Sequence, residues 1–160
     1  MFHIILFTPQ IPPNTGNIIR LSANTGTQLH LIKPLGFRLD EKSCRRAGLD
    51  YHALANVHLH KNLDECFKIL ASARLFAITS HGTKSLFDQK LAAGDAFLFG
   101  SESAGLPESV HTRFNTDQKL RLPMIAGNRS LNLANAASIV VYEAWRQTGF
   151  VTSGKDINFG

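Results

Sequence analysis

Apolar residues recur along this chain in short runs, and the segments between the runs have helical spacing. Five runs bounded by turn residues have the length of buried strands: residues 2–7, 28–32, 74–79, 96–99 and 119–122. Three segments between them have the periodicity or end signals of helices: residues 14–24, 40–47 and 63–71. Strands that alternate with helices predict an α/β fold, with a mainly parallel sheet and helices on both faces.

The last helix and the loop before it form the most distinctive segment. Small and apolar side chains recur there at the i, i+3, i+4 spacing of one helical face: Ala134, Ala137, Ser138, Val141, Tyr142 and Trp145. Ser130 occupies the N-cap position, as Asn14 does for the first helix, which Gly26 is expected to end. A loop that leads into a capped helix presents several free backbone N–H groups, which suits a polar small molecule or an anion. The alternative is an ordinary loop and core helix, with Ser130 only a cap.

Length and composition predict one domain without a membrane span. The chain has 160 residues, and no apolar run approaches the ~18 residues of a spanning helix. Residues 149–160 have little periodicity and are expected to form a loose tail. Cys44 and Cys66 match no metal or redox spacing, so we expect reduced thiols and a cytoplasmic protein. His58 and His60 alternate as on one strand face, but no partner cluster is expected nearby, so no metal site is predicted.

Charge makes a nucleic acid a candidate partner. The formal net charge is +5, and residues 1–80 hold nine Lys and Arg against five Asp and Glu. Basic surfaces attract nucleic acids through phosphate contacts and counterion release. The excess is modest, so composition alone does not decide the partner.

The glycine-rich segments exclude two common cofactor classes. Gly100 and Gly105 have the spacing of a phosphate loop, but Leu106 and Pro107 stand where Lys and Ser or Thr are required, which argues against an NTPase. No G-x-G-x-x-G follows the first strand, which argues against a nicotinamide oxidoreductase. Two Gly- and Ser-rich loops at strand ends remain, one with Glu102 and the other with Ser130 and Asn132, beside a polar loop at Ser80 to Thr83.

These loops carry a family resemblance. FLFGSESAGLP (residues 97–107) and LPMIAGNRSLNLANAASI (residues 122–139) resemble the second and third motifs of the SPOUT RNA methyltransferases, and NTGNIIR (residues 14–20) resembles the first. The compact length and RRAGLDYH (residues 45–52) are similar to the bacterial members that methylate the 2'-hydroxyl of the wobble nucleotide, cytidine or uridine, of leucine tRNAs.

The resemblance implies a deep C-terminal trefoil knot that wraps S-adenosylmethionine. Folds of this kind are otherwise nearly absent from proteins, so periodicity alone would not suggest one. By position, the resemblance assigns cofactor binding to Ile78, Thr79, Gly100, Leu122, Met124 and Ser130. It also implies a homodimer through the last helix, with Tyr142 and Trp145 as anchors.

The same resemblance assigns roles in catalysis. Arg20 would activate the 2'-hydroxyl, Asn14 and Ser130 would orient it or the phosphate, and Glu102 and Asn132 would shape the pocket. A guanidinium has a pKa above ~12 and no acceptor, so we hypothesise that Arg20 holds a phosphate and stabilises oxyanion charge rather than acting as a base. Candidate tRNA backbone contacts are Arg45, Arg46 and Arg129. Three alternatives stay open: another RNA nucleotide as target, a cofactor-free RNA-binding module, and a small-molecule methyltransferase.

Overall fold

The computed structural model of the chain describes residues 1–39 and 54–151. The predicted helix at residues 40–47, with Cys44, Arg45 and Arg46, lies outside the described residues. Residues 152–160 of the predicted tail lie outside them as well. Within the described ranges, no helix is long and apolar enough to cross a membrane.

A seven-stranded sheet forms the centre of the fold, and all of its strand pairs are parallel. Its strands are β1 (His3–Phe7), β2 (Gln28–Ile32), β3 (Val57–His60), β4 (Leu75–Ile78), β5 (Lys84–Ser85), β6 (Ala96–Phe99) and β7 (Lys119–Arg121). The order across the sheet is β3-β2-β1-β6-β4-β7-β5. The five predicted strands are confirmed to within one residue at each end, whereas β5 has only two residues and too little sequence for a periodicity.

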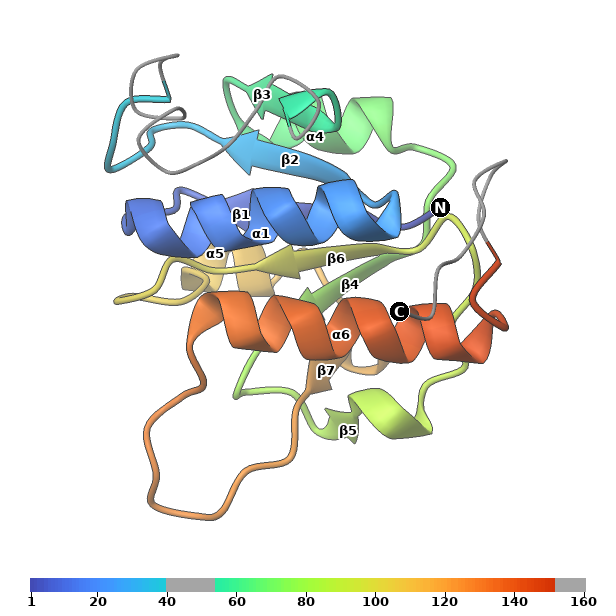
Figure 1. The fold of residues 1–160 in the computed structure, drawn as a ribbon. Coiled ribbons are helices and arrows are strands. Elements are labelled where there is room, and N and C mark those ends of the chain that lie inside the picture. The colour runs from blue at the N-terminus through green and yellow to red at the C-terminus, as the bar shows by residue number, and fades with distance from the viewer. Residues whose placement is uncertain (40–53, 152–160) are drawn as a thin grey trace.

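Helices cover both faces of the sheet, as predicted. The helices α1 (Pro12–Thr25) and α6 (Leu133–Gln147) lie side by side over one face, and α4 (Leu63–Ile69) and α5 (Glu108–His111) lie behind the other (Figure 1). Short 3-10 turns occupy Leu86–Asp88 and Thr116–Gln118. Each face has its own hydrophobic core, and the central strands β1 and β6 contribute side chains to both. Burial on both faces explains why these strands are nearly continuous apolar runs.

The predicted starts of two helices are wrong. The first helix begins at Pro12 with Ile11 as its N-cap, because proline suits the first helical turn, where its missing N–H costs nothing. Asn14 therefore lies inside the helix with its side chain free for other contacts. The cap of α6 is Asn132 rather than Ser130. The predicted end at Gly26 is confirmed, with a left-handed φ of 71°.

Only part of the predicted face of α6 is buried. Ala134, Ala137, Val141 and Trp145 enter the core, but Tyr142 is 48% exposed. Trp145 is 8% exposed, its indole N–H donates to the carbonyl of Val151, and its ring packs edge-on against Phe150. Trp145 therefore packs inside its own chain, and of the two predicted dimer anchors only Tyr142 presents its ring at the surface.

On the face of the sheet that α4 covers, the structure confirms one expectation, about Cys66, and overturns another, about the histidines. The thiol of Cys66 is free and fully buried, as expected of a reduced cysteine, and burial raises its pKa to about 12. His58 and His60 do have partners, because β3 pairs with β2 and sets them beside His30. The expectation that no partner cluster surrounds these histidines is therefore wrong.

Candidate active site

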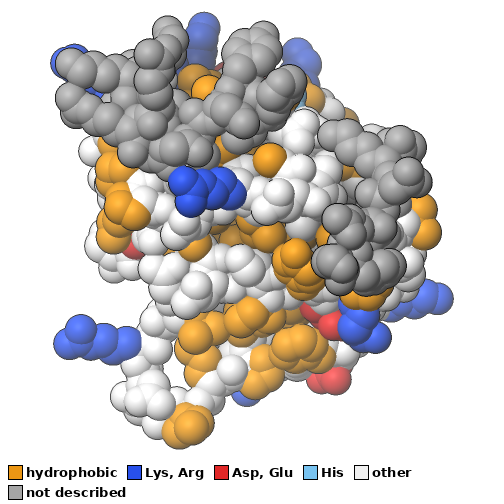
Figure 2. All heavy atoms as spheres, in the orientation of Figure 1, with side chains coloured by type: hydrophobic (Ala, Val, Ile, Leu, Met, Phe, Trp, Pro, Cys, Tyr) orange, Lys and Arg blue, Asp and Glu red, His pale blue; other side chains and the backbone are white. Residues whose placement is uncertain are grey.

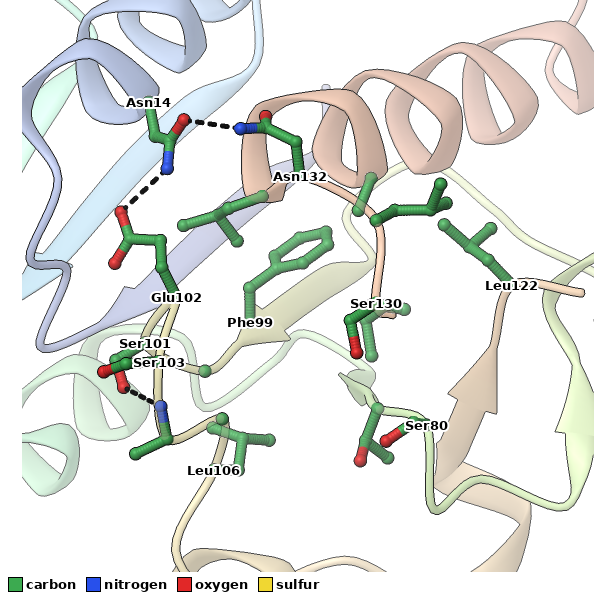
Figure 3. Close-up of a pocket in the computed structure, with 18 of the residues that line it drawn as sticks. Asn14, Ser80, Phe99, Ser101, Glu102, Ser103, Leu106, Leu122, Ser130 and Asn132 are labelled. Atoms are coloured by element: carbon green, nitrogen blue, oxygen red, sulfur yellow. Dashed lines mark hydrogen bonds between the residues drawn. The ribbon is translucent and has the colours of Figure 1, made fainter. Parts of the chain in front are cut away.

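A cavity of about 540 Å³ opens at the carboxyl ends of three neighbouring strands, β4, β6 and β7. Open α/β sheets bind ligands at this edge, because loops and helix N-termini converge there. All of the residues predicted to bind the cofactor line this cavity: Ile78, Thr79, Gly100, Leu122, Met124 and Ser130. Four of the five predicted catalytic residues line it: Ser130, already named, and Asn14, Glu102 and Asn132 (Figure 3).

A chain of hydrogen bonds joins Glu102, Asn14 and Asn132, which belong to the three motif segments. The Asn14 amide donates to Glu102 Oε1 at 3.1 Å, and the Asn132 amide donates to Asn14 Oδ1 at 2.9 Å (Figure 3). Asn14 is 6% exposed, so an unpaired amide there would be costly. It is both donor and acceptor in the chain, which no aspartate could be when ionised.

Glu102 fastens the start of α1 to the loop after β6. Its carboxylate accepts the backbone N–H groups of Gln10, at 2.8 Å, and of Ile11, at 3.1 Å, in addition to the amide of Asn14. Burial of the carboxylate raises its pKa, but these hydrogen bonds outweigh burial and hold the pKa of Glu102 below its ordinary value. Glu102 is therefore ionised at neutral pH and acts as an acceptor, not as an acid.

Asn132 fastens the start of α6 in the same way. Its Oδ1 accepts the backbone N–H groups of Ala134, at 2.9 Å, and Asn135, at 3.3 Å, while its amide reaches Asn14. Ser130, two residues earlier, is exposed at the mouth of the cavity. The side chain of Asn132 thus satisfies two free donors of the helix start, and the cap does not use the Ser130 hydroxyl, which a ligand can contact.

The loop after β6 is folded tightly on itself. Ser101 and Gly105 exchange backbone hydrogen bonds of 3.1 and 2.9 Å across it. A Cβ at Gly100 would overlap the backbone of Gly105 and Leu106. Glycine is therefore required at Gly100, where the backbone forms part of the cavity wall.

The cavity wall also contains residues that the sequence did not indicate. His111 lies in α5, its ring centre is 5.2 Å from that of His81, and its buried Nδ1 has no hydrogen-bond partner among the described residues. Burial lowers the pKa of His111, which favours the neutral form of its ring. His81 lies in the strand-end loop that the sequence did suggest, but thirty positions separate the two histidines, and no spacing rule links them.

The predicted basic residues do not gather in the cavity. Arg20 lies on an exposed part of α1 about 9 Å along the helix from Asn14 and does not line the cavity. Arg129 is exposed in the loop before α6, and Arg45 and Arg46 lie outside the described residues. Among the residues that the structure describes, Glu102 is the only acidic or basic side chain besides His81 and His111 that lines the cavity, and Arg20 and Arg129 are not among its lining residues.

Comparison with known proteins decides the family. Residues 1–142 match the model of the SpoU rRNA Methylase family. The chain belongs to this family.

Three relatives each match more than nine tenths of this chain. The tRNA (cytidine(34)-2'-O)-methyltransferase of Methylovorus glucosotrophus is 53% identical over 94% of this chain and 97% of its own length. A structure solved to explain the 2-OH methylation of C/U34 on tRNA superposes with a TM-score of 0.85, 43% identity, and coverage of 94% and 98% of the two chains. The SpoU methyltransferase AviRb from Streptomyces viridochromogenes, in complex with the cofactor AdoMet, has a TM-score of 0.78 and 27% identity over 91% of this chain and 57% of its own.

Substitutions of Asn132 should distinguish its two roles, which are to cap α6 and to donate a hydrogen bond to Asn14. Asn132→Ala loses both, and we expect it to lower the free energy of unfolding by about 1–2 kcal/mol. Asn132→Asp keeps the cap but cannot donate to Asn14, whose single amide already serves Glu102. We expect the Asp variant to recover the part of the stability that the cap supplies, but not the part lost at the buried Asn14 Oδ1, in urea unfolding. Its affinity for S-adenosylmethionine, the ligand that the motif resemblance implies, should fall. Asn135→Ala, on the same helix but outside the chain of hydrogen bonds, is the control, and equal stability of the Ala and Asp variants would contradict this assignment.

Replacing Gly100 should damage the cavity through the backbone. Gly100→Ala must push the loop away from Gly105, at a cost of about 1–3 kcal/mol, and should abolish measurable cofactor binding in calorimetry. Gly26→Ala is the matched control, because Gly26 has a positive φ of 71° but open space around it, far from the cavity wall. We expect it to lose stability and keep cofactor affinity. Equal loss of affinity in both variants would show that the effect is only global.

Proposed function

We propose that this protein transfers a methyl group from S-adenosylmethionine to the ribose 2'-hydroxyl of the wobble pyrimidine, position 34, of leucine tRNAs. The observation that carries the proposal is the convergence of the three motif segments, through Asn14, Glu102 and Asn132, on one cavity at the strand ends. Support comes from relatives at about half identity that carry the name tRNA (cytidine(34)-2'-O)-methyltransferase. The choice of leucine tRNAs rests on the motif resemblance.

The cavity fits the cofactor in size and in chemistry. A volume of about 540 Å³ lies in the range of small-molecule sites. Apolar walls from Phe99, Leu106 and Leu122 suit the flat and aliphatic parts of such a molecule, and the bare backbone at Gly100 allows close approach. When bound, the cofactor supplies an electrophilic methyl group. Ser130 and Asn132 lie at the mouth of the cavity, where a substrate hydroxyl would approach.

In this proposal the arginines serve the RNA rather than the cofactor. Arg20 is exposed outside the cavity, where it would hold the phosphate beside the target ribose and stabilise the oxyanion that develops on the 2'-oxygen. Arg129 is exposed in the loop that forms the cavity mouth and would contact the tRNA backbone, as would Arg45 and Arg46. Such contacts release counterions, so they predict an affinity that falls steeply with salt.

The proposal includes the knot and the homodimer of the SPOUT fold. The knot rests on the motif resemblance. At the strand ends, the loop after β4 packs closely on its neighbour β7, since a Cβ at Gly82 would lie 2.7 Å from the carbonyl oxygen of Lys119. In support of the dimer, α6 exposes Tyr142 and Ile139, by 48% and 38%, and hydrophobic side chains gather over and below this helix (Figure 2). These two side chains are the contact surface that we propose.

The decisive experiment is methyl transfer from labelled S-adenosylmethionine to bulk tRNA, followed by nucleoside mass spectrometry. A 2'-O-methylated pyrimidine at position 34 of leucine tRNA is the expected product. A label at another nucleotide would keep the enzyme class and overturn the target. Tight RNA binding without cofactor binding would favour the RNA-binding module, and cofactor turnover that tRNA neither supports nor inhibits would favour a small-molecule substrate.

Variants of Arg20 test its role in the same assay. Because a charge near the phosphate suffices in this mechanism, Arg20→Lys should keep a measurable part of the activity, whereas Arg20→Ala should lose about 10²–10³-fold in kcat/KM. Both variants should bind S-adenosylmethionine as the parent protein does, since Arg20 lies outside the cavity. A Lys variant as inactive as Ala, with tRNA still bound, would show that charge alone is not what Arg20 provides.

A charge at Tyr142 tests the dimer. Tyr142→Asp should shift the protein from dimer to monomer in sedimentation velocity, because a carboxylate cannot be buried unpaired in an apolar interface. Leu59→Asp is the matched control, since Leu59 is 47% exposed but lies on β3 at the far edge of the sheet. A dimer that persists in Tyr142→Asp, or dissociation in both variants, would contradict the proposed interface.

A further inference from the structure

Four histidines meet at the sheet edge opposite the methyl-transfer cavity. They come from the first three strands: His3 on β1, His30 on β2, and His58 and His60 on β3. Parallel pairing sets His30 directly opposite His58, so their side chains share a face of the sheet. His3 Nδ1 lies 3.1 Å from His30 Nε2, and His30 Nδ1 lies 2.9 Å from His60 Nε2. None of these residues lines the methyl-transfer cavity.

A cysteine from the helix above completes the cluster. Cys66 lies in α4, which packs over this face, and its sulfur lies with one nitrogen of His30 and one of His60 inside a span of 4.8 Å. All three residues are buried, with His30 and His60 each 3% exposed and Cys66 fully covered. Within the described ranges this is the only group of three such side chains close enough to share an ion.

We propose that His30, His60 and Cys66 bind a divalent transition-metal ion with the ligand preference of zinc. Two imidazole nitrogens and a thiolate are the donors that Zn²⁺ and Co²⁺ select, whereas Mg²⁺ and Ca²⁺ require oxygen donors. On binding, the metal takes the place of the proton between the two histidines. That proton moves to the other ring nitrogen of the histidine that carried it, so both imidazoles stay neutral, and the thiol proton leaves for solvent.

The geometry needs only small side-chain shifts. Nitrogens about 2.0–2.1 Å from a tetrahedral zinc ion lie roughly 3.4 Å apart, and a thiolate at ~2.3 Å lies roughly 3.6 Å from each nitrogen. The His30–His60 contact of 2.9 Å must therefore open slightly, and the sulfur, now within 4.8 Å, must move closer. The remaining nitrogen of His30 already contacts His3, which is the outer hydrogen bond that orients a metal-binding imidazole.

A separate cavity gives access to the cluster. It has a volume of about 350 Å³, and its wall includes His3, His30, His58 and His60. A metal ion can enter by this route, and a water molecule can take the fourth position. Because the ligands belong to β2, β3 and α4, the bound ion would link the edge strand of the sheet to its neighbour and to the helix above.

Titration of the full-length, metal-free protein with Co²⁺ tests the site. We expect one equivalent to produce a thiolate-to-metal charge-transfer band and the intense visible bands of tetrahedral coordination, and Zn²⁺ to remove both. Zn²⁺ should also raise the Tm by several degrees. Cys66→Ser should lose the charge-transfer band, and His60→Gln should weaken binding. His3→Gln should keep the band and bind roughly 10–100-fold more weakly.

Two control variants test whether the metal binds at this cluster and not elsewhere in the chain. Cys44→Ser removes the chain's other cysteine and His81→Asn removes a histidine outside the cluster; both should bind Co²⁺ with the parent spectrum. Failure of the parent protein to develop a charge-transfer band would overturn the proposal without any variant. It would leave the cluster as a chain of imidazoles that share protons. A band retained in Cys66→Ser would place the metal elsewhere.

Discussion

The chain of hydrogen bonds from Glu102 through Asn14 to Asn132 is the constraint on which the active-site architecture depends. It joins segments that lie far apart in sequence: the start of α1, the loop after β6, and the start of α6. Each end of the chain also serves a backbone, since Glu102 holds Gln10 and Ile11 and Asn132 caps α6. A change in any one of the three side chains would therefore disturb the loop after β6 and the starts of both helices, and with them the cavity that they border.

The cavity itself is built from backbone more than from side chains. Gly100 leaves no room for a Cβ, and the bridge between Ser101 and Gly105 holds the loop closed on itself. Backbone groups on rigid strand ends cannot move far, so they hold a ligand in one orientation at little entropic cost. The carboxylate of Glu102 already accepts hydrogen bonds from Gln10, Ile11 and Asn14, which hold it in the wall and keep its pKa below the ordinary value.

The sequence predicted the sheet far better than the details of the site. Strands such as β6 are short apolar runs with clear boundaries, because they are buried on both faces, and they were placed correctly. The helix caps were misplaced, because Ser130, Asn132 and Asn14 are all good capping residues and only tertiary contacts decide among them. Tyr142 and Trp145 share a helical spacing, yet the position of Phe150 and Val151 decides that only the tryptophan is enclosed. The predicted residues that line the cavity come from motif resemblance, not from periodicity, and His111 comes from neither.

The histidine cluster is a site that sequence spacing does not predict. His30 and His60 are thirty positions apart, and Cys66 follows on a different element, so no local spacing rule joins them. What brings them together is the parallel register of β2 and β3, which places each histidine beside a residue of the next strand. Buried imidazoles of this kind lose hydration and must find partners, and here the partners are chiefly one another. A cation that replaces the shared proton would satisfy the same nitrogens, and the same burial that excludes water from them would strengthen its hold.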